Sequence, residues 1–303
     1  MRFQCMLGRM SFHFATPARL LTLAAWLATL AACAAEPVAP RLSGATIALL
    51  GEVHDNAQGQ RERLVLLRRA LADGWRPAIA MEQFDTDRQA DIDRARREGP
   101  RDAQHLIDLA ASERSGWDWA LYRPVIDLAL QYGLPLLAAN LPGADTSKVV
   151  RGGYASVFDA ARLTSLGLTQ AIEPAWQAAQ EREIDAGHCG MLPSALWPAM
   201  ARAQFARDAV MAAVLRAAGA DGVVLIAGNG HVRRDIGVAR WLGPAEQARV
   251  LAIGYLEAAP SGERSDNSGI DASGVFDRVV RVRAAARPDP CEAFAKRPAA
   301  AQR

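Results

Sequence analysis

The stretch TIALLGEVHDN, residues 46 to 56, starts as a continuous apolar run and ends in Gly51, Glu52 and His54. A run that is apolar on both faces predicts a strand of a parallel sheet covered by helices. The polar residues follow where such a strand would turn toward a helix. The G-x-x-H spacing marks either an ordinary turn or a reactive group, and the rest of the sequence must separate the two.

Similar runs recur along the chain and alternate with segments of helical periodicity. Further strands are predicted at Ala78–Glu82, Leu134–Asn140, Gly222–Gly228 and Arg249–Leu256, with a half-exposed edge strand at Arg278–Ala284. Helices are predicted at Gly59–Gly74, Asp85–Gly99 and Tyr122–Gly133. This alternation predicts an α/β fold, a three-layer, doubly wound and mainly parallel sheet. The span from Pro142 to Ala220 is too long for one crossover, so we expect a helical subdomain inserted into the sheet domain, or a cap over it.

The N-terminal segment has the features of an export signal. Residues 20–32 form an apolar run that is too short for a comfortable membrane span. The run ends in LAAC at Cys33, which resembles the lipobox of bacterial lipoproteins, and a plain signal peptide cut near Ala35 is the alternative. The resemblance implies lipidation of Cys33 and an outer-membrane protein that faces the periplasm. Either Met1 or Met10 is the start.

These features give the following division of the chain: signal peptide 1–32, lipidated linker 33–43, α/β domain 44–286 with a helical insertion at about 143–220, and tail 287–303. Export would place the chain in an oxidising compartment. Only Cys189 and Cys291 lie in the body of the chain, so we expect a disulfide, with two free thiols or a soft metal site as alternatives. The formal net charge of +2 and the lack of a basic run argue against nucleic acid as a partner.

The opening motif has a second copy, Gly228–His231, after another predicted strand. Glu82 also stands at a strand end. Ligands of open α/β sheets bind outside the carboxyl ends of the strands, so these side chains should converge on one crevice. Two imidazoles and a carboxylate (His54, His231 and Glu82) suit zinc, manganese or cobalt.

Two other interpretations of these residues remain open. Without a metal, one histidine could act as a general base oriented by Glu52 or Glu82. A lone histidine after a strand is more often a satisfied turn residue, and Asn140, which precedes Leu141-Pro142, is more typical of a turn. The glycines would let the backbone turn sharply and approach a ligand.

Five segments together resemble the ChaN family of haem-binding lipoproteins, which is grouped with the Tiki proteins and the erythromycin esterases. They are LLGEVHDN, AIAMEQF, GWDWALYRPVIDLALQYGLPLLAANLP, RAQFARDAVMA and AGNGHVRRDIGVARWL. The resemblance implies His54, His231 and Glu82 as a metal or catalytic core, with Glu52 beside them. It also implies that Arg207 and Asp208 face the same crevice and help to bind the cofactor; a surface charge pair on a helix is the alternative.

The resemblance further implies haem binding, haem and iron uptake, and a homodimer. Haem iron requires an axial Tyr, His, Met or Cys in an apolar pocket. Tyr154, which we expect in an exposed loop, and His188 are the candidates for cofactor binding. Tyr122 and Tyr132 are expected to pack in the core. The alternative function is a metal-dependent hydrolase, a protease or an esterase.

Overall fold

The computed structural model describes residues 42, 45–99, 102–111, 116–219, 221–258, 274–289 and 291–292. The predicted signal peptide, Cys33 and most of the C-terminal tail lie outside these residues. Within the described part, no helix is long and apolar enough to cross a membrane. The predicted domain boundaries stay predictions.

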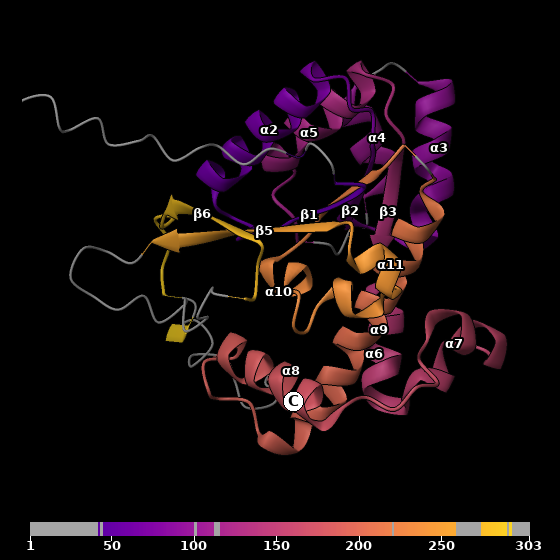
Figure 1. Cartoon of the computed structure of the whole chain (residues 1–303), viewed down its shortest axis with the longest axis vertical. Coiled ribbons are helices and arrows are strands. Elements are labelled where there is room, and N and C mark those ends of the chain that lie inside the picture. Colours follow the sequence, from indigo (N-terminus) through magenta and orange to yellow (C-terminus); the bar gives the residue numbers. More distant parts are fainter. Residues whose placement is uncertain are drawn as a thin grey trace, which may run out of the picture. The chain divides into compact units, whose positions relative to one another are not determined.

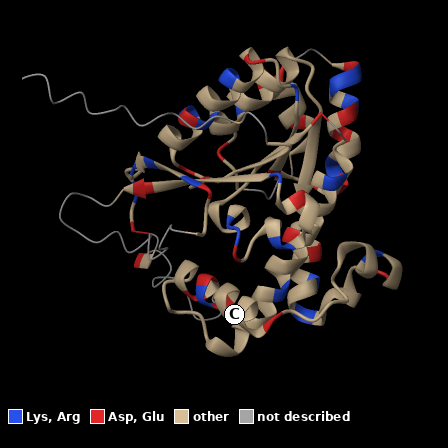
Figure 2. Ribbon diagram, viewed as in Figure 1, with Lys and Arg blue, Asp and Glu red and all other residues tan. Residues whose placement is uncertain are grey.

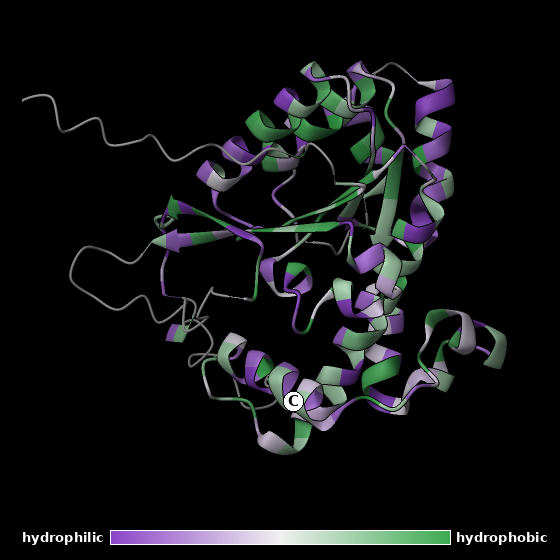
Figure 3. Cartoon of the chain, viewed as in Figure 1, coloured by the Kyte–Doolittle hydropathy of each residue, from purple (hydrophilic) through white to green (hydrophobic). Residues whose placement is uncertain are grey.

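Six strands form one sheet in the order β3-β2-β4-β1-β5-β6, and every neighbouring pair is parallel. The strands are β1 (Ile47–Leu50), β2 (Ala78–Asp85), β3 (Leu136–Asn140), β4 (Val223–Ile226), β5 (Val250–Ala258) and β6 (Arg278–Arg283). The predicted α/β fold with a parallel sheet is therefore confirmed. β6 is a half-exposed edge strand, as its alternating sequence indicates. The central strands are predominantly hydrophobic (Figure 3).

Successive side chains of a strand point to opposite faces of the sheet, and helices cover both faces. Leu50 packs in the core under α2 (Ala57–Ala72) and α5 (Trp119–Gln131), whereas Leu49 packs in the core under α9 (Trp197–Ala217). Figure 1 shows α2 and α5 on one side of the sheet, and α9, α10 (Asn229–Val232) and α11 (Pro244–Gln247) on the other. These three layers are the predicted doubly wound arrangement.

The predicted helix bounds differ from the observed ones where a capping residue lies further upstream. Asn56 caps α2 and accepts a hydrogen bond from the Gly59 N–H, so this helix starts before the predicted Gly59. Asp118 caps α5 in the same way, ahead of the predicted Tyr122. The helix predicted at Asp85–Gly99 is a 3-10 turn, η2 (Thr86–Arg88), followed by α3 (Gln89–Glu98), because β2 continues to Asp85. Charged residues of both signs occur along α3, as its polar sequence predicts (Figure 2). The short α4 (Ala103–Ala110) follows.

The described residues between β3 and β4 form helices joined by short loops. The helices are α6 (Gly143–Gly152), η3 (Tyr154–Ser156), α7 (Ala160–Leu166), α8 (Pro174–Gly187), η4 (Ser194–Leu196) and α9. The first half of α9 packs among these helices through Phe205, and its second half packs on the sheet through Met211 and Leu215. One helix therefore joins the inserted segment to the sheet.

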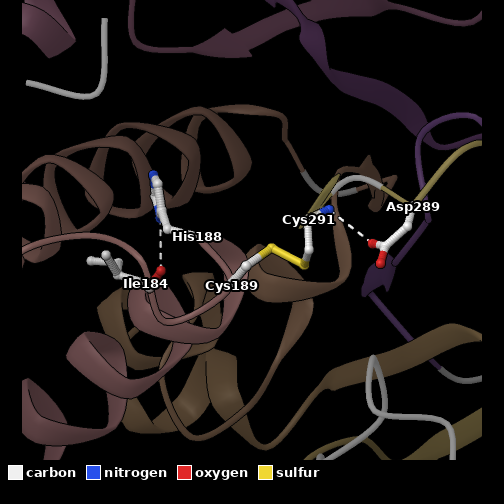
Figure 4. Close-up of a disulfide and its surroundings, with 5 residues drawn as sticks. All are labelled: Ile184, His188, Cys189, Asp289 and Cys291. Atoms are coloured by element: carbon white, nitrogen blue, oxygen red, sulfur yellow. Dashed lines mark hydrogen bonds between the residues drawn. A yellow bond between two sulfur atoms is a disulfide. The ribbon is translucent and has the colours of Figure 1, made fainter. Parts of the chain in front are cut away.

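The predicted disulfide between Cys189 and Cys291 is present, with a Cα–Cα distance of 5.6 Å (Figure 4). It links the loop after α8 to the segment that follows β6. Arg287 of that segment forms ion pairs with Asp55 at 2.9 Å and Glu257 at 2.5 Å. The end of the described chain is therefore tied both to the inserted helices and to the loop after β1.

Candidate functional site

The carboxyl ends of β1 and β4 lie side by side, level with the middle of β2. Leu50 is in register with Ile226, and Ile226 is in register with Met81. The chain leaves β1 toward α2 on one face, and it leaves β4 toward α10 on the other. This reversal is a topological switch point, where open α/β sheets form ligand crevices. Glu52 and His231 follow the ends of β1 and β4, and Glu82 lies beside them within β2.

Glu52 is the centre of a buried hydrogen-bond network. Its side chain is 1% exposed. One carboxylate oxygen accepts hydrogen bonds from Tyr122 at 2.7 Å and Gln83 at 3.0 Å, and lies 2.8 Å from Nδ1 of His54. The other oxygen accepts from Gln60 at 3.1 Å and from Arg63. So many fixed donors hold the carboxylate in one position, and the carboxylate in turn holds the His54 imidazole.

The charges around Glu52 keep it ionised. Burial favours the neutral acid, but the Arg63 guanidinium and the His54 and Tyr122 hydrogen bonds outweigh it and hold the pKa of Glu52 below its ordinary value. The pKa of His54 is raised. Burial opposes protonation of the imidazole, but the hydrogen bond to Glu52 and the charge of Glu82 outweigh that effect. The His54 side chain remains 47% exposed, so solvent reaches the imidazole.

Glu82 lies near both His54 and His231 and is also buried. One of its oxygens accepts a hydrogen bond from Arg207 at 2.5 Å and lies 3.6 Å from Nε2 of His231, and the other accepts from the Gly228 N–H at 2.7 Å. Burial disfavours the charged form, but His231 and Arg207 outweigh it and lower the pKa of Glu82 to about 2. Glu82 is therefore a stable anion at neutral pH.

His231 is oriented by Asp208, which lies 2.6 Å from its Nδ1 atom. The Asp208 side chain is 2% exposed, and burial raises its pKa although the charge and hydrogen bond of His231 act against this. Arg207, the preceding residue on α9, also binds Asn140 at 2.9 Å. Both residues therefore act on site side chains. The alternative of a surface charge pair is wrong, because Asp208 points into the molecule.

The glycines of the two motifs make room for each other's side chains. A Cβ atom on Gly228 would lie 3.0 Å from Cε1 of His54. A Cβ atom on Gly51 would lie 2.2 Å from the Asn229 side-chain oxygen. Asn229 is held there by two hydrogen bonds to the backbone of Tyr255, at 2.7 and 3.0 Å. The sequence suggested that these glycines allow a sharp backbone turn. Their role is instead to let the loop after β1 and the loop after β4 pack closely together.

The expected divalent metal on His54, Glu82 and His231 is not supported. Within the described residues, no group of three or more His, Cys, Asp or Glu side chains is arranged to hold a metal ion. The physical reason is that the Arg207 guanidinium already provides the cation beside Glu82. Nε2 of His231 also faces this carboxylate, at 3.6 Å, while Nδ1 of each histidine bonds a carboxylate of its own. The arrangement is instead two carboxylate–histidine pairs on either side of a buried anion.

The two candidate haem ligands lie outside this crevice. Tyr154 is in η3, not in an exposed loop; its ring packs half-buried against two apolar clusters of the inserted helices. Burial raises its pKa to about 12, with Arg202 acting in the opposite direction. His188 follows α8 beside the disulfide, with Nδ1 2.7 Å from the Ile184 carbonyl oxygen (Figure 4).

Sequence reasoning missed the residues that hold Glu52, namely Gln60, Arg63, Gln83 and Tyr122. Tyr122 is buried as predicted, but its hydroxyl group serves the site. Tyr132, by contrast, is 41% exposed beneath Arg76 and does not pack in the core. The sequence of α2 did contain a signal for two of them. Gln60 and Arg63 occupy the same helix face as Leu67 and Leu71, which indicates that they point into the molecule.

Residues 38–242 match the sequence model of the family described as haem-binding uptake, Tiki superfamily, ChaN. The chain belongs to this family, and the match covers both G-x-x-H motifs and the whole inserted segment. No curated protein sequence matches the chain.

Among solved structures, the chain is similar to ChaN of Campylobacter jejuni, the subject of a study of cofacial haem binding. The TM-score is 0.54 at 17% identity, over 74% of this chain and 85% of that one. It is also similar to a mutant erythromycin esterase, EreC, in its open conformation, with a TM-score of 0.44 at 15% identity over 73% of this chain and 72% of that one. At these identities the likeness to ChaN supports the fold.

Proposed function

We propose that this chain binds haem and serves haem and iron uptake. The observation that carries the proposal is the family match over residues 38–242, which includes all of the inserted helices. The similarity in fold to C. jejuni ChaN, whose structure concerns haem binding, agrees with it.

Tyr154 is the proposed axial ligand, because its surroundings suit a haem. The ring lies among apolar and aromatic side chains, including Phe158 and Trp241. Within the described residues the Tyr154 hydroxyl group forms no hydrogen bond, so ligation would break none. Bound haem would supply an iron centre of high affinity for an anionic oxygen ligand. Burial favours the neutral phenol, and the nearby Arg202 partly offsets this by favouring the phenolate. His188 is the second candidate for this role.

A haemin titration tests this proposal. The full chain should give a saturable Soret band, and Tyr154→Phe should weaken binding by at least tenfold, or about 1.4 kcal/mol. Tyr132→Phe is the matched control, because Tyr132 is exposed. His188→Ala tests the second candidate. Weak, unsaturable binding by the unmodified chain would contradict haem binding itself, and light scattering with and without haemin would test for a homodimer.

We also propose that Cys33 is acylated and anchors the protein to the periplasmic face of the outer membrane. The LAAC sequence supports this, and a disulfide in the body of the chain suits an oxidising compartment. In a Gram-negative host, Cys33→Ser should move the protein from the membrane fraction to the soluble fraction. Retention of that variant in the outer membrane would contradict the anchor.

A second candidate function is acid–base catalysis of hydrolysis in the crevice. The observation that favours it is the pair of histidines held by buried carboxylates at 2.8 and 2.6 Å, since a positioned imidazole of this kind can transfer protons. His54, the half-exposed one, would act as the base. An ester and peptide substrate panel should show turnover that His54→Ala abolishes and that chelators do not affect. A silent panel with the unmodified chain would contradict this function without affecting the haem proposal.

A further inference from the structure

A separate cavity lies among the inserted helices, away from the crevice. Its volume is about 390 Å³, and it is lined by the turn after α7, by α8 and α9, and by the segment from η5 (Val238–Trp241) to the start of α11. None of the crevice residues lines it. Arg216, one of its lining residues, lies about 13 Å along α9 from Arg207, at ~1.5 Å per residue.

One wall of this cavity is aromatic and fixed. The Trp176 and Trp241 rings have their centroids 5.1 Å apart at 55°, and Phe205 lies behind them, 5.1 Å from Trp176. The Trp176 indole N–H donates to the Ile236 carbonyl at 3.1 Å, which sets the ring orientation. A rigid indole wall offers a large apolar contact to a flat ring at little entropic cost.

The same cavity has an excess of positive charge. The Arg240 guanidinium lies 4.6 Å from the centroid of Trp176 and pairs with Glu173 at 3.0 Å. The Glu173 side chain is 71% exposed, so that pair is weak and exchangeable. Arg216 is exposed and donates to the Trp241 carbonyl at 2.9 Å. Among the described residues, Arg216 has no acidic partner. Two guanidinium groups therefore face one cavity with a single mobile counter-charge.

We propose that this cavity binds a small aromatic carboxylate. The ring would lie against Trp176 and Trp241, and the carboxylate would accept hydrogen bonds from Arg216 and Arg240, whose planar groups match its geometry. The volume is within the range of small-molecule pockets, about 300–1,000 Å³. The described lining contains no Tyr, His, Met or Cys, so it offers haem iron no axial ligand. Tyr154 does not line the cavity, although Trp241 adjoins both, and the proposal does not rest on haem binding.

Isothermal titration of the full chain with 2-naphthoate tests the proposal, with 2-naphthalenemethanol as the neutral isostere. We expect saturable naphthoate binding and at least about tenfold weaker binding of the alcohol, because a hydrogen bond to a charged group is lost. Arg216→Gln and Arg240→Gln should each weaken naphthoate binding by a similar factor. Arg151→Gln, an exposed arginine of α6 outside the cavity, is the matched control and should have no effect.

Ala171→Trp provides a test that leaves both arginines in place. Ala171 is an exposed lining residue, so a larger side chain should fill the cavity without disturbing the core and should abolish naphthoate binding. Equal binding of acid and alcohol, unchanged binding in both arginine variants, or no binding at millimolar concentration would overturn the proposal.

Discussion

His54 and His231 occupy equivalent positions after two neighbouring strands, yet the His54 side chain is 47% exposed and that of His231 only 10%. The partner of His54, Glu52, is held by residues of α2, β2 and α5 in the sheet domain. The partner of His231, Asp208, comes from α9, which belongs partly to the inserted segment. The same G-x-x-H spacing thus places one imidazole at the solvent and fixes the other in the interior.

The comparison shows that the spacing specifies only the position of each histidine after its strand. The exposure of each histidine and the charges around it depend on the element packed against it. On the β1 side that element supplies Arg63, a buried cation beneath the carboxylate. On the β4 side it supplies Arg207, whose side chain is 17% exposed and faces the crevice. The arginine that pairs with Glu52 is therefore closed to solvent, whereas the arginine that pairs with Glu82 is partly accessible to it.

The largest expected effect comes from removing the cation beneath Glu52. Arg63→Met should reduce the free energy of unfolding by about 3–5 kcal/mol, because it leaves a buried carboxylate without its partner. Urea denaturation measures this change. Arg69→Met, an exposed position on the same helix, is the control and should stay within about 0.5 kcal/mol. A loss of less than about 1 kcal/mol in Arg63→Met would mean that Glu52 is not the anion that the network indicates.

A smaller effect is expected on the other side of the crevice, and it depends on pH. The folded-state pKa of Glu82 is about 2 against an ordinary value of 4.5, so its contribution to stability is fully present above 4.5 and is lost as the pH falls toward 2. The shift corresponds to about 3 kcal/mol. Glu82→Gln should lower stability at pH 7 and flatten the decline in this acid range.

Denaturation midpoints at several pH values between 7 and 3 measure the effect of Glu82→Gln. Glu98→Gln, an exposed carboxylate on α3, provides the control and should keep the acid slope of the unmodified chain. An unchanged slope in Glu82→Gln would show that Glu82 is not held ionised by His231 and Arg207.

The two motif glycines should respond differently to a single methyl group. Gly51→Ala should cost about 1–3 kcal/mol, because the new Cβ meets the Asn229 oxygen, which two hydrogen bonds hold in place. Gly228→Ala should cost less than about 1 kcal/mol, because the half-exposed His54 ring can move away. It should nevertheless displace His54 from the crevice. Thermal denaturation of both variants measures the two losses of stability, and the NMR signals of the His54 imidazole report its displacement. Equal losses of stability would contradict the prediction.

Much of the fold could be predicted from the sequence, because strands buried on both faces have a continuous apolar composition. The prediction failed where burial depends on distant partners. β2 was expected to end at Glu82, since Gln83 and Asp85 are polar, yet it continues to Asp85. The Gln83 side-chain nitrogen donates to Glu52, and Asp85 accepts a hydrogen bond from Asn140. Convergence of Glu52, Glu82, His54 and His231 followed from strand ends alone. The residues that bond these four side chains could not be predicted in this way. A polar residue on a helix is expected to face solvent until the neighbouring element is known.

The smallest expected effect concerns the charge of His54. Glu52 and Glu82 together raise its folded-state pKa, so protonated His54 stabilises the fold below its ordinary value of 6.5, and this contribution is lost as the pH rises through the folded-state pKa. Glu82→Gln removes one of the two charges and should lower the pKa of His54, which an NMR titration of the imidazole measures. Glu98→Gln should leave the titration unchanged. If the pKa of His54 does not fall in Glu82→Gln, the charge of Glu82 does not act on His54. The two G-x-x-H motifs would then be independent sites.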